Sequence, residues 1–199
     1  MLVFAYGSLL WRPGFKPKAC MPAVANGWRR SWCVESRVHR GTSEMPGIVL
    51  GLVEGGRCSG VAYSVESSEK ARVAEYLSAR EMAEQGYRPE MIEVETPEGI
   101  RAALAYVSDP GHRINAPAPT LFKRIMTCRG SSGTNVEYAA RTFASIRELN
   151  DELTDMDAGL PRAMVSTIRT IARYNAVGSH NYANRLTLLR EPTAEAVSP

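Results

Sequence analysis

The spacing of apolar residues changes along this chain, and that change limits which folds it can adopt. Up to about residue 107, most segments alternate apolar and polar side chains with the period of two that is typical of β-strands. After Pro119 the apolar residues recur at intervals of three and four, as in helices that bury one face. One helical segment, residues 67–81, interrupts the strands. This order predicts an α+β fold around a mainly antiparallel sheet that could close on itself.

Turn and capping signals separate the expected elements. Glycine-containing tetrapeptides at residues 54–57 and 96–99 predict two hairpins. Residues 134–137 predict a capping box at the start of a long amphipathic helix. The expected strands cover residues 2–6, 23–34, 48–53, 60–65, 87–95 and 100–107, and the expected helices cover residues 67–81, a segment after Pro119, residues 134–156 and residues 161–174.

The composition is that of one compact domain. Of the 199 residues, 44% are hydrophobic and 23% are charged, which is enough apolar side chain for one sizeable core. We expect a single domain over residues 1–177. Residues 178–199 show no periodicity, so we expect a loosely held C-terminal tail there.

Charge and cysteine usage argue against several classes of function. The net charge of +3 is small and the basic residues are spread out, so we expect no nucleic-acid partner and interpret Arg29-Arg30 as a solvated strand face. The four cysteines show no Cys-x-x-Cys spacing and only three histidines accompany them, which predicts neither a metal site nor a disulfide framework. The N-terminus lacks a basic leader, and Arg12-Pro13-Gly14 interrupts it before a membrane span could form. We therefore expect a cytoplasmic protein with reduced thiols and no membrane contact.

The opening strand runs directly into Gly7, Ser8 and Leu9. Residues 2–6 are apolar, β-branched or aromatic, as in a buried strand. Gly7 lets the backbone turn sharply and lets another molecule approach, because no Cβ stands in the way. The successive amides could then converge into a nest for a carboxylate or an oxyanion. A tight turn whose hydroxyl satisfies the backbone would explain the same residues.

Glu81 lies at the expected C-terminal end of the helix over residues 67–81. Val73, Leu77 and Glu81 are four residues apart, so the acid falls on the stripe that the two apolar residues should bury. Burial and the negative end of the helix dipole should both raise the pKa of Glu81, while Arg80 should lower it. The alternative is a frayed helix end with a solvated Glu81 paired to a neighbouring base.

Seven short motifs occur in an order that resembles the ChaC family of γ-glutamylcyclotransferases. A single Tyr-Gly-Ser is weak, whereas the ordered set, which covers roughly residues 2–150, is specific. The chain departs from the family pattern at Ala5, where glycine is common, at Val38, where an acid often precedes the histidine, and at residues 82–87, which replace the double-glycine link of animal members. The motifs are Phe4-Ala5-Tyr6-Gly7-Ser8-Leu9-Leu10-Trp11, Gly27-Trp28-Arg29-Arg30, His39-Arg40-Gly41-Thr42, Pro46-Gly47, Gly60-Val61-Ala62-Tyr63, Tyr76-Leu77-x-x-Arg80-Glu81 and Gly133-x-Asn135-x-Glu137-Tyr138.

The resemblance implies a small mixed β-barrel flanked by helices, and an enzyme that cleaves a γ-glutamyl amide. The typical substrate is glutathione, which yields 5-oxoproline and Cys-Gly. The resemblance also implies that Glu81 is the catalytic acid/base and that no metal or organic cofactor takes part. Tyr87 and Tyr138 could line the pocket, or could be buried tyrosines with satisfied hydroxyls. The residues implied to hold the γ-glutamyl group are Ala5, Tyr6, Gly7, Ser8, Leu9 and Leu10.

Elementary chemistry agrees with these roles. The α-amine of a γ-glutamyl substrate can attack the substrate's own γ-carbonyl, so the enzyme needs no nucleophile and supplies proximity by folding the substrate. An ammonium must lose a proton, the leaving amine must gain one and the oxyanion needs donors. One glutamate of raised pKa can perform both proton transfers. Two other hypotheses stay open: a cyclotransferase for other γ-glutamyl dipeptides or amines, and a non-catalytic regulatory protein of the same fold. The sequence leaves the oligomeric state open.

Overall fold

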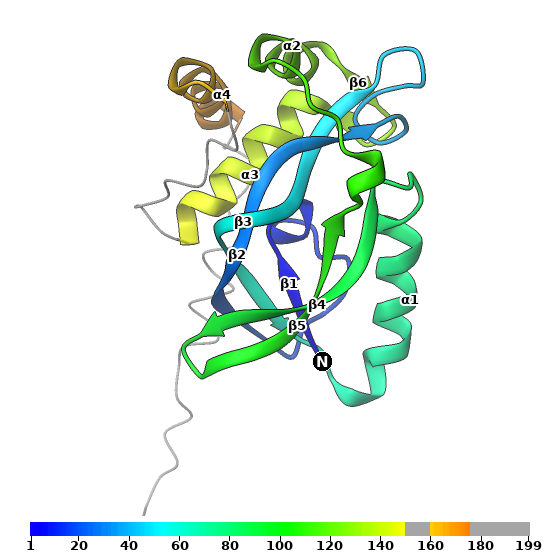
Figure 1. The fold of residues 1–199 in the computed structure, drawn as a ribbon, viewed down its shortest axis with the longest axis vertical. Helices are drawn as coiled ribbons and strands as arrows, with labels where there is room; N and C mark the ends of the chain where they lie inside the picture. Colours follow the sequence, from blue (N-terminus) through cyan, green and yellow to red (C-terminus); the bar gives the residue numbers. More distant parts are fainter. Residues whose placement is uncertain (150–159, 176–199) are drawn as a thin grey trace, which may run out of the picture.

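The computed structural model describes residues 1–149 and 160–175, and its centre is a closed five-stranded barrel (Figure 1). The strands follow the order β1, β3, β2, β4, β5, and β5 pairs with β1 to close the barrel. Neighbouring strands are antiparallel except β1 and β5, which run parallel where Val3 faces Leu104. The predicted mixed, mainly antiparallel barrel is confirmed. Its strands are β1 (Leu2–Ala5), β2 (Ala19–Ser36), β3 (Gly47–Ser64), β4 (Tyr87–Thr96) and β5 (Gly99–Ser108).

The two longest strands, β2 and β3, bend together at a glycine-rich point. The predicted hairpin at residues 54–57 is wrong, because β3 continues through it, and β2 extends beyond the expected residues 23–34 at both ends. Gly55 and Gly56 have φ of +89° and +88°, and Gly27 on the partner strand has φ of +80°. The pairing register shifts at this point. Glycine adopts this conformation without a Cβ clash, so a β-bulge bends strands that a turn would have separated.

The second predicted hairpin, between β4 and β5, is confirmed. Thr96 faces Gly99 at the tip, where Gly99 has φ of +101°. The Thr96 hydroxyl donates to the Gly99 carbonyl at 2.8 Å, which fixes the turn.

Helices cover the barrel on two sides (Figure 1). α1 lies along one side, while α2, α3 and α4 lie together on the other, with α3 against β3. The helical segment that begins at Ser67 opens as a 3-10 turn, and no side chain caps it. The Glu137 amide donates to the Thr134 hydroxyl at 3.2 Å, which bears out the first half of the predicted capping box of α3. The helical elements are η1 (Ser8–Leu10), η2 (Ser67–Glu69), α1 (Lys70–Glu81), η3 (Pro110–His112), α2 (Ala118–Thr127), α3 (Asn135–Leu149) and α4 (Arg162–Asn175), with the short strands β6 (Arg129–Gly130) and β7 (Gly133–Thr134) between α2 and α3.

Three expectations about the C-terminal part concern residues that the structure does not describe. The predicted extension of α3 to residue 156, the domain boundary at residue 177 and the tail over residues 178–199 lie outside the described residues. Within residues 1–149 and 160–175, no helix is long and apolar enough to cross a membrane.

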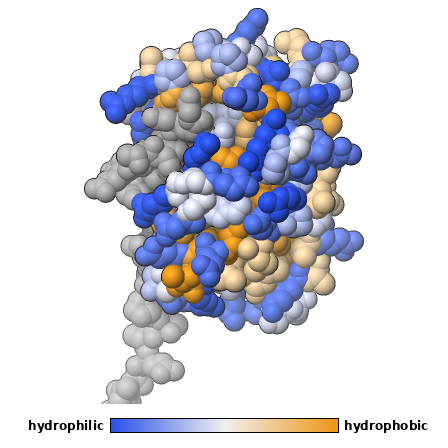
Figure 2. All heavy atoms as spheres, viewed as in Figure 1, coloured by the Kyte–Doolittle hydropathy of each residue, from blue (hydrophilic) through white to orange (hydrophobic). Residues whose placement is uncertain are grey.

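The core fills the barrel and continues beneath α3. The Trp32 ring lies 6.1 Å from the rings of both Tyr138 and Phe143, in edge-to-face geometry. On the outside, polar side chains are interspersed with apolar ones over the face in Figure 2. The interpretation of Arg30 as solvated is wrong, because this residue is 1% exposed. Alternate residues of a strand share a face, so Arg30 points the same way as Trp28 and Trp32, into the molecule.

Candidate active site

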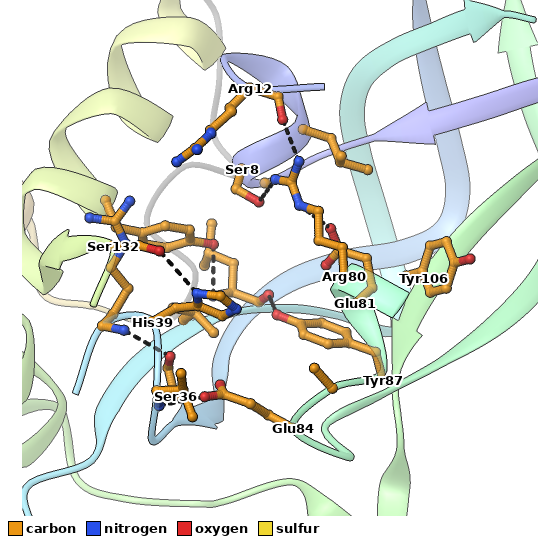
Figure 3. A pocket seen from close by; sticks show the side chains of 18 of the residues that line it. Ser8, Arg12, Ser36, His39, Arg80, Glu81, Glu84, Tyr87, Tyr106 and Ser132 are labelled. Atoms are coloured by element: carbon orange, nitrogen blue, oxygen red, sulfur yellow. Dashed lines mark hydrogen bonds and ion pairs between the residues drawn. The ribbon is translucent and has the colours of Figure 1, made fainter. Parts of the chain in front are cut away.

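A cavity of about 550 Å³ opens where η1, the end of α1 and the loop after β2 meet (Figure 3). Small-molecule sites typically have volumes of roughly 300–1,000 Å³. Ala5 and Leu10, although predicted to hold substrate, are fully buried and do not line the cavity. The other predicted residues all lie at its wall: Tyr6, Gly7, Ser8, Leu9, Glu81 and Tyr87.

The chain turns at Gly7 into the single turn of η1. The Leu10 amide donates to the Gly7 carbonyl at 3.0 Å. The first amides of a helix have no partner within it, and among the described residues the amides of Ser8 and Leu9 donate to no other backbone carbonyl. A Cβ on Gly7 would lie 3.3 Å from the Tyr138 hydroxyl. The turn therefore keeps two amides available at the cavity wall, close to a phenol.

Tyr6, which precedes this turn, is fixed at both ends. Its hydroxyl donates to the Tyr106 carbonyl at 2.7 Å, and its carbonyl accepts from Arg30 Nε at 2.8 Å. Arg30 also donates to the Ser59 carbonyl, so one buried cation ties the start of the turn to β3. Burial, helped by the charge of Glu81, raises the pKa of Tyr6 well above its usual value. Sequence reasoning missed Arg30, and its alternation with the strand's tryptophans was the available signal.

Arg80 joins the end of α1 to η1. Its Nη2 donates to Ser8 Oγ at 2.9 Å, and its Nη1 donates to the Arg12 carbonyl at 2.6 Å and to the Tyr76 hydroxyl at 3.0 Å. Its Nε lies 3.0 Å from Glu81 Oε1. Every nitrogen of this guanidinium contacts the protein, so Arg80 holds the two halves of the site together (Figure 3).

Glu81 ends α1, and its carboxylate lies at the cavity wall. Its side chain is 14% exposed, and Val73 and Leu77 on the same stripe are fully buried, as predicted. Oε1 makes no hydrogen bond with the described residues, because the nearby Arg80 Nε–H is not aimed at it. Burial raises the pKa of Glu81, and the charge of Arg80 opposes this more weakly. An acid of raised pKa without a fixed hydrogen bond is suited to taking and returning a proton.

Two tyrosines bind the same residue of β3 and face the cavity. The Tyr87 hydroxyl donates to the Leu50 carbonyl at 2.7 Å, and the Leu50 amide donates to the Tyr138 hydroxyl at 3.2 Å. Both predicted descriptions therefore hold, since these side chains have partners and also line the cavity. Burial raises the pKa of Tyr87 well above its usual value and that of Tyr138 to about 12. Tyr138 stays protonated and, because its hydroxyl accepts from Leu50, it keeps its own hydrogen for another acceptor.

Two further basic side chains, His39 and Arg40, line the cavity, and Figure 3 shows His39 across from Glu81. His39 Nδ1 lies 2.9 Å from Ser132 Oγ. Arg40 is 5% exposed, and its guanidinium carbon lies 5.7 Å from the ring centres of both Trp11 and Tyr138. The sequence predicts that both lie in a polar loop near the site, favours a surface or hydrogen-bonded histidine at His39 and gives Arg40 no role of its own. They reach the site through a loop without regular structure, which hydrophobic periodicity does not describe.

The residues of this site lie in a part of the sequence that matches a known protein family. A family model described as ChaC-like protein matches residues 1–168. The chain belongs to the ChaC family. The resemblance found in the sequence is therefore confirmed, and residues 1–168 of the ChaC match include all the residues that line the cavity.

Curated relatives and solved structures agree with this membership. The glutathione-specific γ-glutamylcyclotransferase 1 of Danio rerio is 34% identical over 179 residues, which cover 85% of this chain and 91% of the relative. The glutathione-specific γ-glutamylcyclotransferase of Escherichia coli is 31% identical, over 85% of this chain and 74% of the relative. A crystal structure of a γ-glutamylcyclotransferase specific to glutathione from yeast superimposes with a TM-score of 0.73 at 21% identity, and covers 85% of this chain and 96% of that one. The ChaC chain thus shares the fold of that structure.

The described part of the ChaC chain contains no cluster of side chains that could bind a metal ion. No three His, Cys, Asp or Glu side chains gather there as metal ligands would. The titratable groups at the cavity wall are instead one buried acid, a second acid at Glu84, tyrosines and basic residues.

Proposed function

We propose that this protein is a γ-glutamylcyclotransferase that cleaves glutathione into 5-oxoproline and Cys-Gly. The observation that carries the proposal is the buried carboxyl group of Glu81, which shares one cavity with the turn after β1. Two curated relatives carry this activity in their names. The cavity volume of about 550 Å³ is also adequate for a tripeptide.

Glu81 serves as the catalytic acid/base in this proposal. As carboxylate it takes a proton from the substrate α-ammonium, and the freed amine attacks the γ-carbonyl carbon. The new C–N bond closes the five-membered ring and places negative charge on the former carbonyl oxygen. Glu81 then returns this proton to the cysteine nitrogen as the original amide bond breaks. The ring nitrogen still carries one proton too many and passes it to the freed amine, which leaves as an ammonium group. A raised pKa suits both steps, because it makes the carboxylate a stronger base and leaves the acid able to donate.

The turn after β1 supplies donors to the γ-glutamyl group. The available amides of Ser8 and Leu9 and the hydroxyl hydrogen of Tyr138 can stabilise an oxyanion or hold the α-carboxylate. Neither Ala5 nor Leu10 touches the substrate in this arrangement. They act by filling the space behind the turn, since both are 0% exposed.

The direct test is to incubate the purified protein with glutathione, without added metal, and to measure 5-oxoproline and Cys-Gly. We expect the two products in equal amounts. A panel of γ-glutamyl dipeptides and amines run in parallel separates glutathione cleavage from a broader γ-glutamyl specificity. A protein that binds glutathione but releases no 5-oxoproline would be the non-catalytic member of the fold and would overturn the proposal.

A cytoplasmic location is part of the same proposal. Cys33 and Cys128 carry free thiols, as is usual in a reducing compartment. Glutathione is also abundant where thiols are kept reduced, so enzyme and substrate would meet there.

A further inference from the structure

Three arginines lie near Trp11, and two of them, Arg12 and Arg40, line the cavity. The guanidinium carbons of Arg40 and Arg141 lie 5.7 Å and 5.4 Å from the Trp11 ring. Arg12 follows Trp11 in the chain and lines the cavity, and Figure 3 shows its side chain directed away from the carbonyl that Arg80 holds. Burial is the main cause that lowers the pKa of Arg40, and the charges of Arg141 and Arg12 lower it further, so both cations lie close enough to repel Arg40.

The protein neutralises this cluster only in part. Glu137 forms ion pairs with Arg141 at 2.9 Å and with Arg40 at 3.6 Å. Besides Glu81, the cavity wall has one more acid, Glu84. Its carboxylate accepts hydrogen bonds from two backbone amides in the loop after β2, those that follow Ser36. Among the described residues, one carboxylate therefore pairs with two of the three guanidinium groups, and positive charge remains for an anion to neutralise.

Arg40 also keeps donors that the protein does not use. Its Nη1 donates to the Thr134 carbonyl at 3.0 Å, while its Nε and Nη2 make no hydrogen bond with the described residues. A guanidinium group stacked on aromatic faces presents its remaining N–H groups along its edge, in the geometry that matches a carboxylate. A nearly buried cation with free donors at a cavity wall is the arrangement expected at an anion site.

We propose that Arg40 and Arg12 receive the C-terminal carboxylate of the tripeptide substrate, and that they make the site selective for γ-glutamyl peptides that carry this second carboxylate. The inference rests on the proposed function. In this arrangement Glu81 and the η1 turn hold the γ-glutamyl group. Arg12 and Arg40 line the same cavity, and Figure 3 shows the side chain of Arg12 extending away from Arg80 and Glu81. An extended dipeptide unit spans roughly 7 Å, which lets the Cys-Gly part of glutathione reach across such a cavity.

Glutathione and its glycinamide, in which the C-terminal carboxylate is an uncharged amide, form the first comparison. Both have the same γ-glutamyl bond, so the reacting atoms are unchanged. We expect kcat/KM for the glycinamide to be at least roughly tenfold lower, as for the loss of a charge-assisted contact. The loss should appear mainly as a higher KM, because the contact is made equally before and during the reaction.

The second comparison uses Arg12→Gln, with Arg72→Gln as its matched control. Arg12 is exposed, so the variant should fold, and the control removes the same charge from the outer side of α1. We expect Arg12→Gln to raise KM for glutathione roughly three- to tenfold, to leave the glycinamide unaffected and so to narrow the ratio between the two substrates. Arg72→Gln should leave that ratio unchanged.

Two results would separate this inference from the proposed function. If the wild-type protein releases 5-oxoproline from neither peptide, the proposed function fails. If it cleaves glutathione and the glycinamide with equal kcat/KM, or if Arg12→Gln lowers both to the same extent, the carboxylate site is overturned while the cyclotransferase activity stands.

Discussion

The acid end of the cavity, at Glu81 and Arg80, and the basic end, at Arg40 and Arg12, use arginine in different ways. At the acid end, Nη1 and Nη2 of Arg80 donate to a serine hydroxyl, a backbone carbonyl and a tyrosine hydroxyl, while its Nε lies 3.0 Å from the Glu81 carboxylate without a hydrogen bond. At the basic end, Arg40 is more deeply buried than Arg80, but only its Nη1 donates to a described residue. Both side chains carry the same charge beside aromatic or aliphatic surface. The difference lies in how many donors the protein leaves unused.

This difference separates a positioning residue from a binding residue. A guanidinium group whose two terminal nitrogens are both hydrogen-bonded to the protein is fixed in place, and its charge acts on its neighbours rather than on a ligand. A guanidinium group with free donors gains more from an incoming anion, because its desolvation is not yet compensated by hydrogen bonds. The two ends can therefore be separated by variants that impair one end only.

The largest effect is expected for Glu81→Gln, which removes the acid end and leaves the basic end intact. Turnover should fall by about 10²- to 10⁴-fold, the usual contribution of a general acid/base, while glutathione still binds. Rates of 5-oxoproline release and calorimetric binding of glutathione test both halves. Glu84→Gln is the matched control, since it changes the other acid at the cavity wall and should keep most of the turnover. A Glu81→Gln protein with wild-type turnover would remove this residue from its catalytic role.

Arg80→Met tests whether Arg80 holds the η1 turn and the end of α1 in position. It leaves Ser8, Tyr76 and the Arg12 carbonyl without their donor, so we expect the free energy of unfolding to fall by about 1–3 kcal/mol in chemical denaturation. Activity should fall for glutathione and for its glycinamide alike, unlike the selective loss expected for Arg12→Gln.

The pH dependence of kcat/KM distinguishes a purely structural role for Arg80 from an effect of Arg80 on the pKa of Glu81. The positive charge of Arg80 lowers the pKa of Glu81, so removing it should move the acid limb of the kcat/KM profile to higher pH. Arg12→Gln, which does not touch Glu81, serves as the control. If both variants keep the wild-type acid limb, Arg80 does not set the proton affinity of the catalytic carboxyl group.

The sequence predicted the acid end better than the basic end, for physical reasons. Glu81 belongs to a helix, where a spacing of four places a residue on one face whatever the rest of the fold does. Arg40 lies in a loop whose path depends on distant contacts, such as the backbone of Thr134, and no local pattern gives that path. Strand alternation gives a usable signal for Arg30, whereas the doublet Arg29-Arg30 by itself predicts a solvated face. The glycines at residues 54–57 bend a paired strand because the partner strand continues alongside.

Gly7→Ala probes the turn that faces Glu81. The new Cβ would lie 3.3 Å from the Tyr138 hydroxyl, so that hydroxyl must shift by a few tenths of an ångström. We expect KM for all γ-glutamyl substrates to rise by roughly tenfold, since the displaced phenol and the amides beside it hold the common γ-glutamyl group. Steady-state kinetics with glutathione and its glycinamide check this. Unchanged affinity for both would count against the η1 turn as a substrate site.

The smallest effect concerns stability, and it uses the raised pKa of Glu81 itself. Below the usual carboxyl pKa near 4.5 the side chain is protonated in both the folded and the unfolded chain, so it contributes no difference. As the pH rises above that value, the unfolded chain ionises first and is favoured, so stability is lost until the pH passes the raised pKa of the folded protein. Each pKa unit corresponds to about 1.4 kcal/mol.

Glu81→Gln should therefore be more stable than the wild-type protein at pH 8 and nearly equal to it at pH 4. Denaturant melts at the two pH values measure this difference, and Glu84→Gln supplies a control at a carboxylate held by backbone amides. A Gln variant that is less stable than the wild-type protein at pH 8, but not at pH 4, would mean that the ion pair with Arg80 outweighs burial. In that case Arg80 would stabilise the ionised carboxyl group of Glu81 by more than burial destabilises it, and the cavity would not contain an acid of raised pKa.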